Sequence, residues 1–150
     1  MIWLGLALFF GLHIMPSAPN VRDNLIGRFG EKPYKGMYAL LSLAGLVLIA
    51  MGYSNMAYVE LWPTPTWASH LALTVMPVVC ILWVAAEFKG HIRLKTRHPM
   101  LVGMVLWGIV HLTNNGDQAS LYLFGSFVLY SLIAIVSANR RGKLPAYETA

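Results

Sequence analysis

The stretch LWPTPTWASHLALTVMPVVCILWVAA, residues 61–86, contains no Asp, Glu, Lys or Arg and is long enough to cross a lipid bilayer. The hydrocarbon core is roughly 30 Å thick, which a helix covers in about 20 residues. A backbone in lipid must satisfy its own hydrogen bonds, so such a stretch is expected to be helical. Four more stretches share this lack of charge: residues 1–21, 36–59, 98–116 and 118–139. The sequence predicts an all-α integral membrane bundle of five transmembrane helices, folded as a single domain over residues 1–150.

The basic residues predict the orientation of this bundle. All 11 Lys and Arg residues fall into three clusters between or after the uncharged stretches. The clusters are Arg22, Arg28, Lys32 and Lys35; Lys89, Arg93, Lys95 and Arg97; and Arg140, Arg141 and Lys143. Cytoplasmic loops are enriched in Lys and Arg, and five crossings that start outside bring all three clusters to one side. We therefore predict that the N-terminus lies outside and the C-terminus inside.

The amino-acid composition limits the classes of protein to which this chain can belong. The chain is 57% hydrophobic and only 11% charged, which excludes an ordinary soluble domain. Its net charge of +5 is explained by loops that face anionic lipid. No basic patch with interleaved aromatic residues accompanies this charge, so nucleic acid is not an expected partner. The expected partners are membrane lipids.

Two histidines are polar residues at membrane depth, where polar side chains point to function. His13 follows Trp3 by about 15 Å of helix, and His111 precedes Asp117 by about 9 Å. Two neutral imidazoles at similar depth on different helices could hold a haem iron from both faces. Equally, each could simply hydrogen-bond a neighbouring helix, and the residues alone leave both interpretations open. His70 and His98, near the ends of their helices, are the reserve ligands.

Five segments carry a resemblance to a known family. They are FGLH at 10–13, GEKPYKGMY at 30–38, RHPMLVG at 97–103, WGIVHLTNNGD at 107–117 and SLYLFGS at 120–126. In this order, over nearly the whole chain, they resemble the NnrU family of bacterial membrane proteins. The resemblance implies a multi-pass protein of the bacterial inner membrane that is associated with nitrite and nitric oxide metabolism. Plant zeta-carotene isomerases have a similar histidine pattern and use haem b to isomerise a cis double bond in a polyene.

The resemblance also implies site residues. His13 and His111 correspond to the axial haem b ligands of the isomerases. The position three before the second ligand is Cys in those enzymes and Gly108 here, which removes thiolate exchange at this position. The expected function is haem b binding, with either nitric oxide or a lipid-soluble polyene as the partner and redox-dependent isomerisation as the possible enzyme activity. Assembly into a homo-oligomer is left open. Family members usually continue past the position of Ala150, so the absence of a C-terminal portion from this sequence is left open as well.

A competing resemblance concerns Arg97, His98 and Pro99, which are followed by Gly103. This pattern is similar to the motif with which isoprenylcysteine carboxyl methyltransferases and phospholipid methyltransferases bind S-adenosylmethionine, although Leu101 stands in place of the motif's Tyr. The structural interpretation is that Arg97 reaches toward lipid headgroups while Pro99 occupies the first turn of a helix, where its missing N–H does no harm. The methyltransferase is kept as the alternative function, with Arg97 and His98 as its cofactor-binding candidates.

Overall fold

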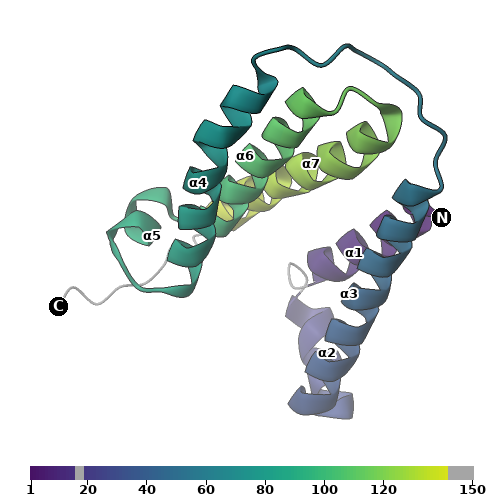
Figure 1. The fold of residues 1–150 in the computed structure, drawn as a ribbon. Helices are drawn as coiled ribbons and strands as arrows, with labels where there is room; N and C mark the ends of the chain where they lie inside the picture. The colour runs from purple at the N-terminus through teal and green to yellow at the C-terminus, as the bar shows by residue number, and fades with distance from the viewer. Residues whose placement is uncertain (16–18, 142–150) are drawn as a thin grey trace. The chain divides into compact units, whose positions relative to one another are not determined.

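The computed structural model describes residues 1–15 and 19–141, and these residues form seven helices and no β-strand (Figure 1). Pro16 and Lys143 lie outside the described residues. The helices are α1 (Ile2–Ile14), α2 (Pro19–Phe29), α3 (Glu31–Ser54), α4 (Ala68–Glu87), α5 (His91–Thr96), α6 (Pro99–Asn114) and α7 (Gln118–Arg140). The predicted all-helical architecture is confirmed.

Three of these helices, α3, α4 and α7, are long and apolar enough to cross a membrane. Large apolar side chains stay exposed along them, among them Leu40, Leu73 and Leu129. So much exposed apolar surface is unfavourable in water but is stable in contact with lipid. The helices therefore indicate a membrane protein.

The other two predicted spans are shorter than expected. Helix α1 has 13 residues and α6 has 16, or about 20 and 24 Å of helix. Two of the basic clusters, expected as loops, contain the helices α2 and α5. Charge-free length overestimates a helix because turn residues such as Asn115 and Gly116 are uncharged too.

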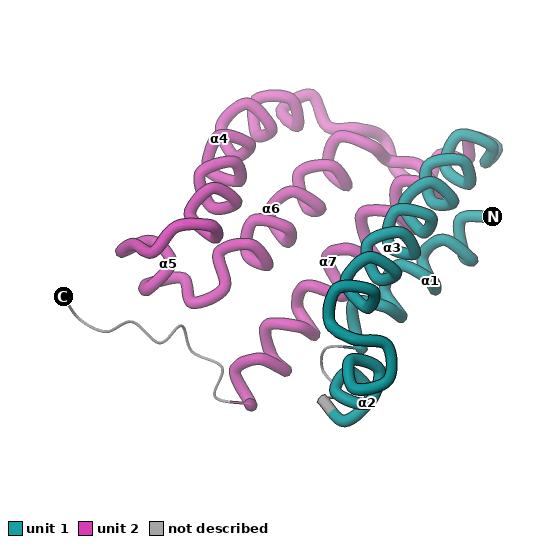
Figure 2. The backbone as a smooth tube through the Cα atoms, turned by 90° about the horizontal axis from the view of Figure 1, so that it is seen from below, with its two compact units in different colours: residues 1–57 teal, residues 58–150 magenta. Residues whose placement is uncertain are grey.

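Contacts divide the chain into two compact units, residues 1–57 and 58–150 (Figure 2). Each unit is described by itself below. Both lie within the span that the sequence predicts to be one domain.

In the first unit, α1 packs along α3 at glycines that let the two backbones approach closely. A Cβ added at Gly5 would lie 2.6 Å from the Ile49 nitrogen, and one at Gly45 would lie 3.1 Å from the Phe9 nitrogen. At Gly52 an added Cβ would collide with the backbone of Ile2. Small residues at helix contacts are how membrane helices gain packing energy, because lipid gives them no hydrophobic drive to associate.

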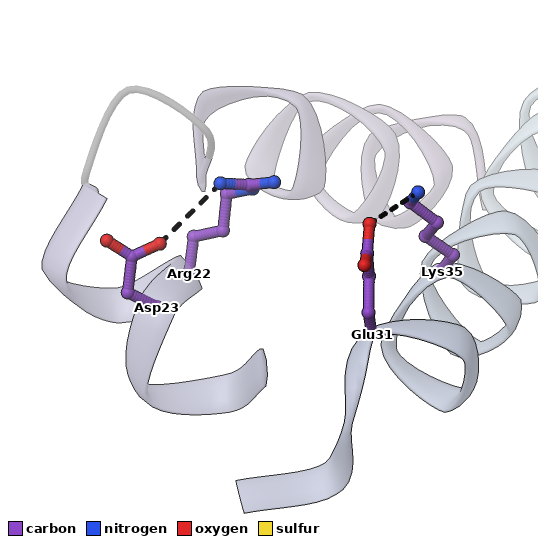
Figure 3. Close-up of polar contacts among 4 residues, drawn as sticks. All are labelled: Arg22, Asp23, Glu31 and Lys35. Atoms are coloured by element: carbon purple, nitrogen blue, oxygen red, sulfur yellow. Dashed lines mark ion pairs between the residues drawn. The ribbon is translucent and has the colours of Figure 1, made fainter. Parts of the chain in front are cut away.

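Helix α2 leads into α3 through Gly30, whose φ of 86° lies in the left-handed region that favours glycine. The charges here pair locally (Figure 3). Lys35 lies 2.7 Å from Glu31, one turn earlier in α3, and Arg22 lies 3.5 Å from Asp23. All four side chains are exposed, so these pairs contribute little stability.

In the second unit, α6 packs against both α4 and α7. Glycines again mark the contacts on α6. Gly103 meets the ring of Trp83, to which an added Cβ would lie 2.7 Å away, and a Cβ at Gly108 would collide with the Val128 side chain. Helix α6 is thus positioned by contacts on two sides, which fixes the direction of the side chains that it carries.

A backbone clasp, in which residues 59–62 pair with residues 116–118, joins the segment before α4 to the connection between α6 and α7. The amides of Leu61 and Trp62 donate to the Gly116 carbonyl at 2.7 and 3.1 Å, and the Gln118 amide donates to the Val59 carbonyl at 2.9 Å. Gly116 has no positive φ, so its backbone conformation does not itself require glycine. Instead it is glycine because a Cβ there would collide with the carbonyl of Trp62.

Two side chains reinforce the clasp. The Trp62 indole donates to the Leu112 carbonyl at 3.3 Å, and the Asn114 amide donates to the Ala68 carbonyl at 3.1 Å. The Leu112 carbonyl is one of the last four of α6, which have no partner within their own helix unless one is supplied, and Ala68 is the first residue of α4. The clasp therefore holds the beginning of α4 beside the end of α6.

Asp117 caps the following helix. Its carboxylate accepts from the amide of Ser120 at 2.9 Å and from the hydroxyl of the same residue at 2.6 Å, all in a buried position. Burial raises the pKa of Asp117, but the hydrogen bonds from Ser120 and from the backbone amides of Ala119 and Asp117 together outweigh it and hold the pKa below its ordinary value. A negative charge is also favourable at the start of α7, because the helix dipole is positive there.

Candidate haem-ligating histidines

His111 lies in the last turn of α6 and is fixed by its own helix. Its Nδ1 lies 2.9 Å from the Trp107 carbonyl oxygen. A carbonyl oxygen can only accept, so Nδ1 must carry the proton and donate it. In the neutral imidazole this places the lone pair on Nε2. A backbone carbonyl that orients the distant ring nitrogen in this way is a common feature of metal-binding histidines.

Aromatic rings pack around this imidazole. The ring centroids of Trp107 and Phe124 lie 4.8 and 4.5 Å from that of His111. Trp107 in turn contacts Phe124 and Phe127 edge to face, at 5.0 and 5.6 Å. The half-buried imidazole therefore sits in an apolar aromatic setting between α6 and α7, which restricts its rotation.

His13 repeats the same local arrangement on α1. Its Nδ1 donates to the Phe9 carbonyl at 2.7 Å, which again places the lone pair on Nε2. The imidazole stacks on Phe9 with centroids 4.1 Å apart and lies 5.7 Å from the ring of Tyr38 on α3. Both candidate ligands thus follow an aromatic residue by four positions and bond to its carbonyl.

The helix bounds change the depth estimate for these histidines. His13 lies in the last turn of α1, about 17 Å from Ile2, whereas His111 lies in the last turn of α6, about 5 Å before Asn114. Measured from the outer end of each helix in the topology that the charges predict, the estimates become about 17 Å for His13 and about 5 Å for His111. Ligation of one iron by both histidines stays a prediction.

The reserve ligands are less suited to bind iron. His70 is exposed in the first turn of α4. His98 precedes α6, and its Nε2 donates to the Asn139 side-chain oxygen of α7 at 3.1 Å. That hydrogen bond uses the nitrogen that His13 and His111 keep unprotonated.

The Arg97-His98-Pro99 pattern has a structural explanation in the turn between α5 and α6. Arg97 is exposed and has φ 60°, the one positive φ of a non-glycine residue in the described chain. The His98 amide donates across it to the Thr96 carbonyl at 2.6 Å, and Pro99 is buried at the start of α6. The three residues therefore reverse the chain direction between two helices, a role that needs no cofactor.

Within residues 1–15 and 19–141, no group of three or more His, Cys, Asp or Glu side chains is arranged to hold a metal ion. This finding concerns a metal held by protein ligands alone. Axial ligation of haem needs only two residues, or one, because the porphyrin supplies the remaining nitrogens.

The family model described as NnrU protein matches residues 1–149, almost the entire chain. The chain belongs to the NnrU family. No curated protein and no solved structure matches this NnrU protein significantly. The family assignment is thus confirmed, whereas the likeness to zeta-carotene isomerases rests on the histidine pattern alone.

Sequence reasoning missed the aromatic neighbours of the two histidines in this NnrU protein. Tyr38 and Phe124 come from other helices, and only the packed structure brings them to the imidazoles. The aromatic residues four positions earlier, Phe9 and Trp107, share one helix face with their histidine and could have been found from the spacing.

Proposed function

We propose that this protein crosses the bacterial inner membrane five times, with its N-terminus outside and its C-terminus inside. Three helices of full length and two shorter apolar helices support the five crossings. In each unit the described Lys and Arg residues gather at one end, at α2 and the start of α3 in the first and at α5 and the end of α7 in the second. Lys and Arg favour the cytoplasmic side, which supports the orientation.

We further propose that the protein binds haem b in the membrane and that His111 and His13 are the residues that would hold it. The observation that carries this proposal is the tautomer that both imidazoles share, with Nδ1–H bound to a backbone carbonyl and the lone pair on Nε2. A neutral imidazole with its lone pair on Nε2 can bind iron without first losing a proton. The apolar rings around His111 match the flat, apolar faces of a porphyrin.

Of the two chemistries that the resemblance implies, nitric oxide handling is the better supported. When bound, haem supplies an iron that takes up nitric oxide. Trp107 and Phe124 hold the imidazole of His111 in place, and His111 and His13 are the residues that would hold the haem. The isomerases carry a Cys at the position of Gly108, but here a side chain at that position would collide with Val128. The packing therefore leaves no room for a cysteine at position 108, and thiolate exchange is not expected here.

The visible spectrum tests the haem proposal. Protein purified from cells with haem available should show a Soret band and, after reduction, the sharp α and β bands of a six-coordinate low-spin iron. His111→Ala and His13→Ala should each give a five-coordinate high-spin spectrum or lose the haem. His70→Ala is the matched control, because His70 is exposed and should leave the spectrum unchanged.

Several outcomes would contradict this assignment. Absence of any Soret band would rule out haem. A six-coordinate spectrum in the variant that lacks both histidines would show that other residues bind the iron. A wild-type spectrum that is already five-coordinate and does not change in His13→Ala would assign His111 alone.

Nitric oxide added to the reduced protein should shift the Soret band. Retention of S-adenosylmethionine that Arg97→Lys abolishes would instead favour the methyltransferase.

A further inference from the structure

A groove of about 590 Å³ runs along α4 toward α5. Helix α5 lies beside the end of α4 (Figures 1 and 2). Cys80 and Val84 line it four residues apart on one face of α4, and Phe88, the residue after the helix, continues the lining. From Cys80 to the end of α4 the groove follows the helix for about 10 Å. Its volume falls in the range of about 300–1,000 Å³ typical of ligand sites.

The two ends of this groove differ in chemistry. Its long part is apolar, and Val84 and Phe88 are exposed there. At the α5 end it is lined by His91 and by Arg93, which is half-buried. Such a site has the shape and polarity of a lipid, with a hydrocarbon chain along α4 and a headgroup at α5.

Arg93 has no carboxylate partner within the described residues. The two ion pairs found there are Arg22 with Asp23 and Lys35 with Glu31, both in the other unit. Glu87, the nearest acidic residue in the chain, is exposed and joins no ion pair in the described part. A half-buried guanidinium that carries no anion of the protein is well suited to a phosphate, which it can bind through two parallel hydrogen bonds.

We propose that this groove binds one anionic phospholipid, with an acyl chain along Cys80, Val84 and Phe88 and the phosphate on Arg93 beside His91. The charge of the site selects an anionic headgroup over a zwitterionic one. The proposed orientation places the α5 end at the cytoplasmic leaflet, where anionic lipid gathers. Only the choice of leaflet rests on that orientation, and haem binding is not required.

Native mass spectrometry of the protein tests the proposal. The protein is released from nanodiscs that contain equal amounts of phosphatidylglycerol and phosphatidylcholine, and the retained lipids are counted. The wild type should retain one phosphatidylglycerol in preference to phosphatidylcholine. Arg93→Gln should reduce this preference by about tenfold, because it removes the charge-assisted hydrogen bonds that would hold the anionic headgroup.

Two matched controls separate a site from general attraction. Lys95→Gln removes an equal charge from the same short helix at an exposed position outside the groove, and it should leave the preference intact. Val84→Trp fills the groove and should abolish retention, whereas Leu73→Trp, on an exposed position of α4 outside the groove, should not.

Equal losses in Arg93→Gln and Lys95→Gln would show diffuse attraction and overturn the proposal. Equal retention of the two lipids by the wild type would also overturn it. A dimer mass that Val84→Trp removes would assign the groove to a second copy of the chain. The Soret band is recorded on the same samples, so failure of the lipid site and failure of the haem proposal are read separately.

Discussion

Asp117 combines burial, charge and a capping role in a single side chain. It is buried at the start of α7, and its two bonds to Ser120 replace the water that a carboxylate would otherwise bind. Because its folded pKa is below the ordinary value of 3.8, the ionised form is stabilised by folding. This contribution is complete above the unfolded pKa and is lost as the pH falls through the folded pKa.

Two substitutions at Asp117 should separate capping from charge. Asp117→Ala removes the cap and should lower the free energy of unfolding by about 1–2 kcal/mol. Asp117→Asn can still accept a hydrogen bond from the Ser120 amide, so it should retain most of the free energy of unfolding at neutral pH. Because Asn does not ionise, this variant should lose less stability than the wild type as the pH falls. Thermal unfolding in detergent between neutral pH and pH 3 measures both. A wild type and Asp117→Asn with the same acid dependence would contradict the assigned pKa.

At the scale of elements, the pairing of α1 with α3 depends on glycines that let the helices approach. Gly52→Ala should weaken this pairing, because the new Cβ would collide with the backbone of Ile2 and neither helix can move away without losing contact. Gly11→Ala is the matched control. Nothing lies within 4 Å of a Cβ at Gly11, so the change should be neutral or add up to about 1 kcal/mol of helix propensity.

Disulfide formation between cysteines placed at a contact of the two helices, in a Cys80→Ala background, measures the pairing. Gly52→Ala should slow their cross-linking, and Gly11→Ala should not. Equal rates in both variants would mean that glycine at position 52 is not needed for the approach.

At the scale of the whole molecule, the orientation can be tested with single cysteines in the same background. Asn55→Cys, in the connection after α3, should react from outside intact cells with a maleimide that cannot cross the membrane. Lys95→Cys, on the exposed side of α5, should react only after the cells are opened. Labelling of both positions in intact cells, or of Lys95→Cys alone, would overturn the proposed topology.

Charge and hydropathy were sufficient to predict the class of fold, because a helix that crosses lipid must be uncharged over a length set by the bilayer. They could not predict where α6 ends, since the uncharged residues Asn115 and Gly116 extend the pattern beyond the helix, nor that the uncharged residues 19–21 belong to a separate helix, α2. The two histidines could be selected from their depth and from the family resemblance. Tyr38 and Phe124 could not, because their contacts with the imidazoles depend on how helices rotate against each other.

The backbone clasp has a practical consequence for anyone who adds an epitope to this protein. The connection after α6 is short and uncharged at its start, and it would be a natural place to insert a peptide for antibody detection. An insertion there would separate Gly116 from Trp62 and Gln118 from Val59, and so would detach the start of α4 from the end of α6. An epitope inserted between Ala57 and Tyr58 leaves every one of these bonds intact, because Tyr58 is exposed and precedes the first residue of the clasp.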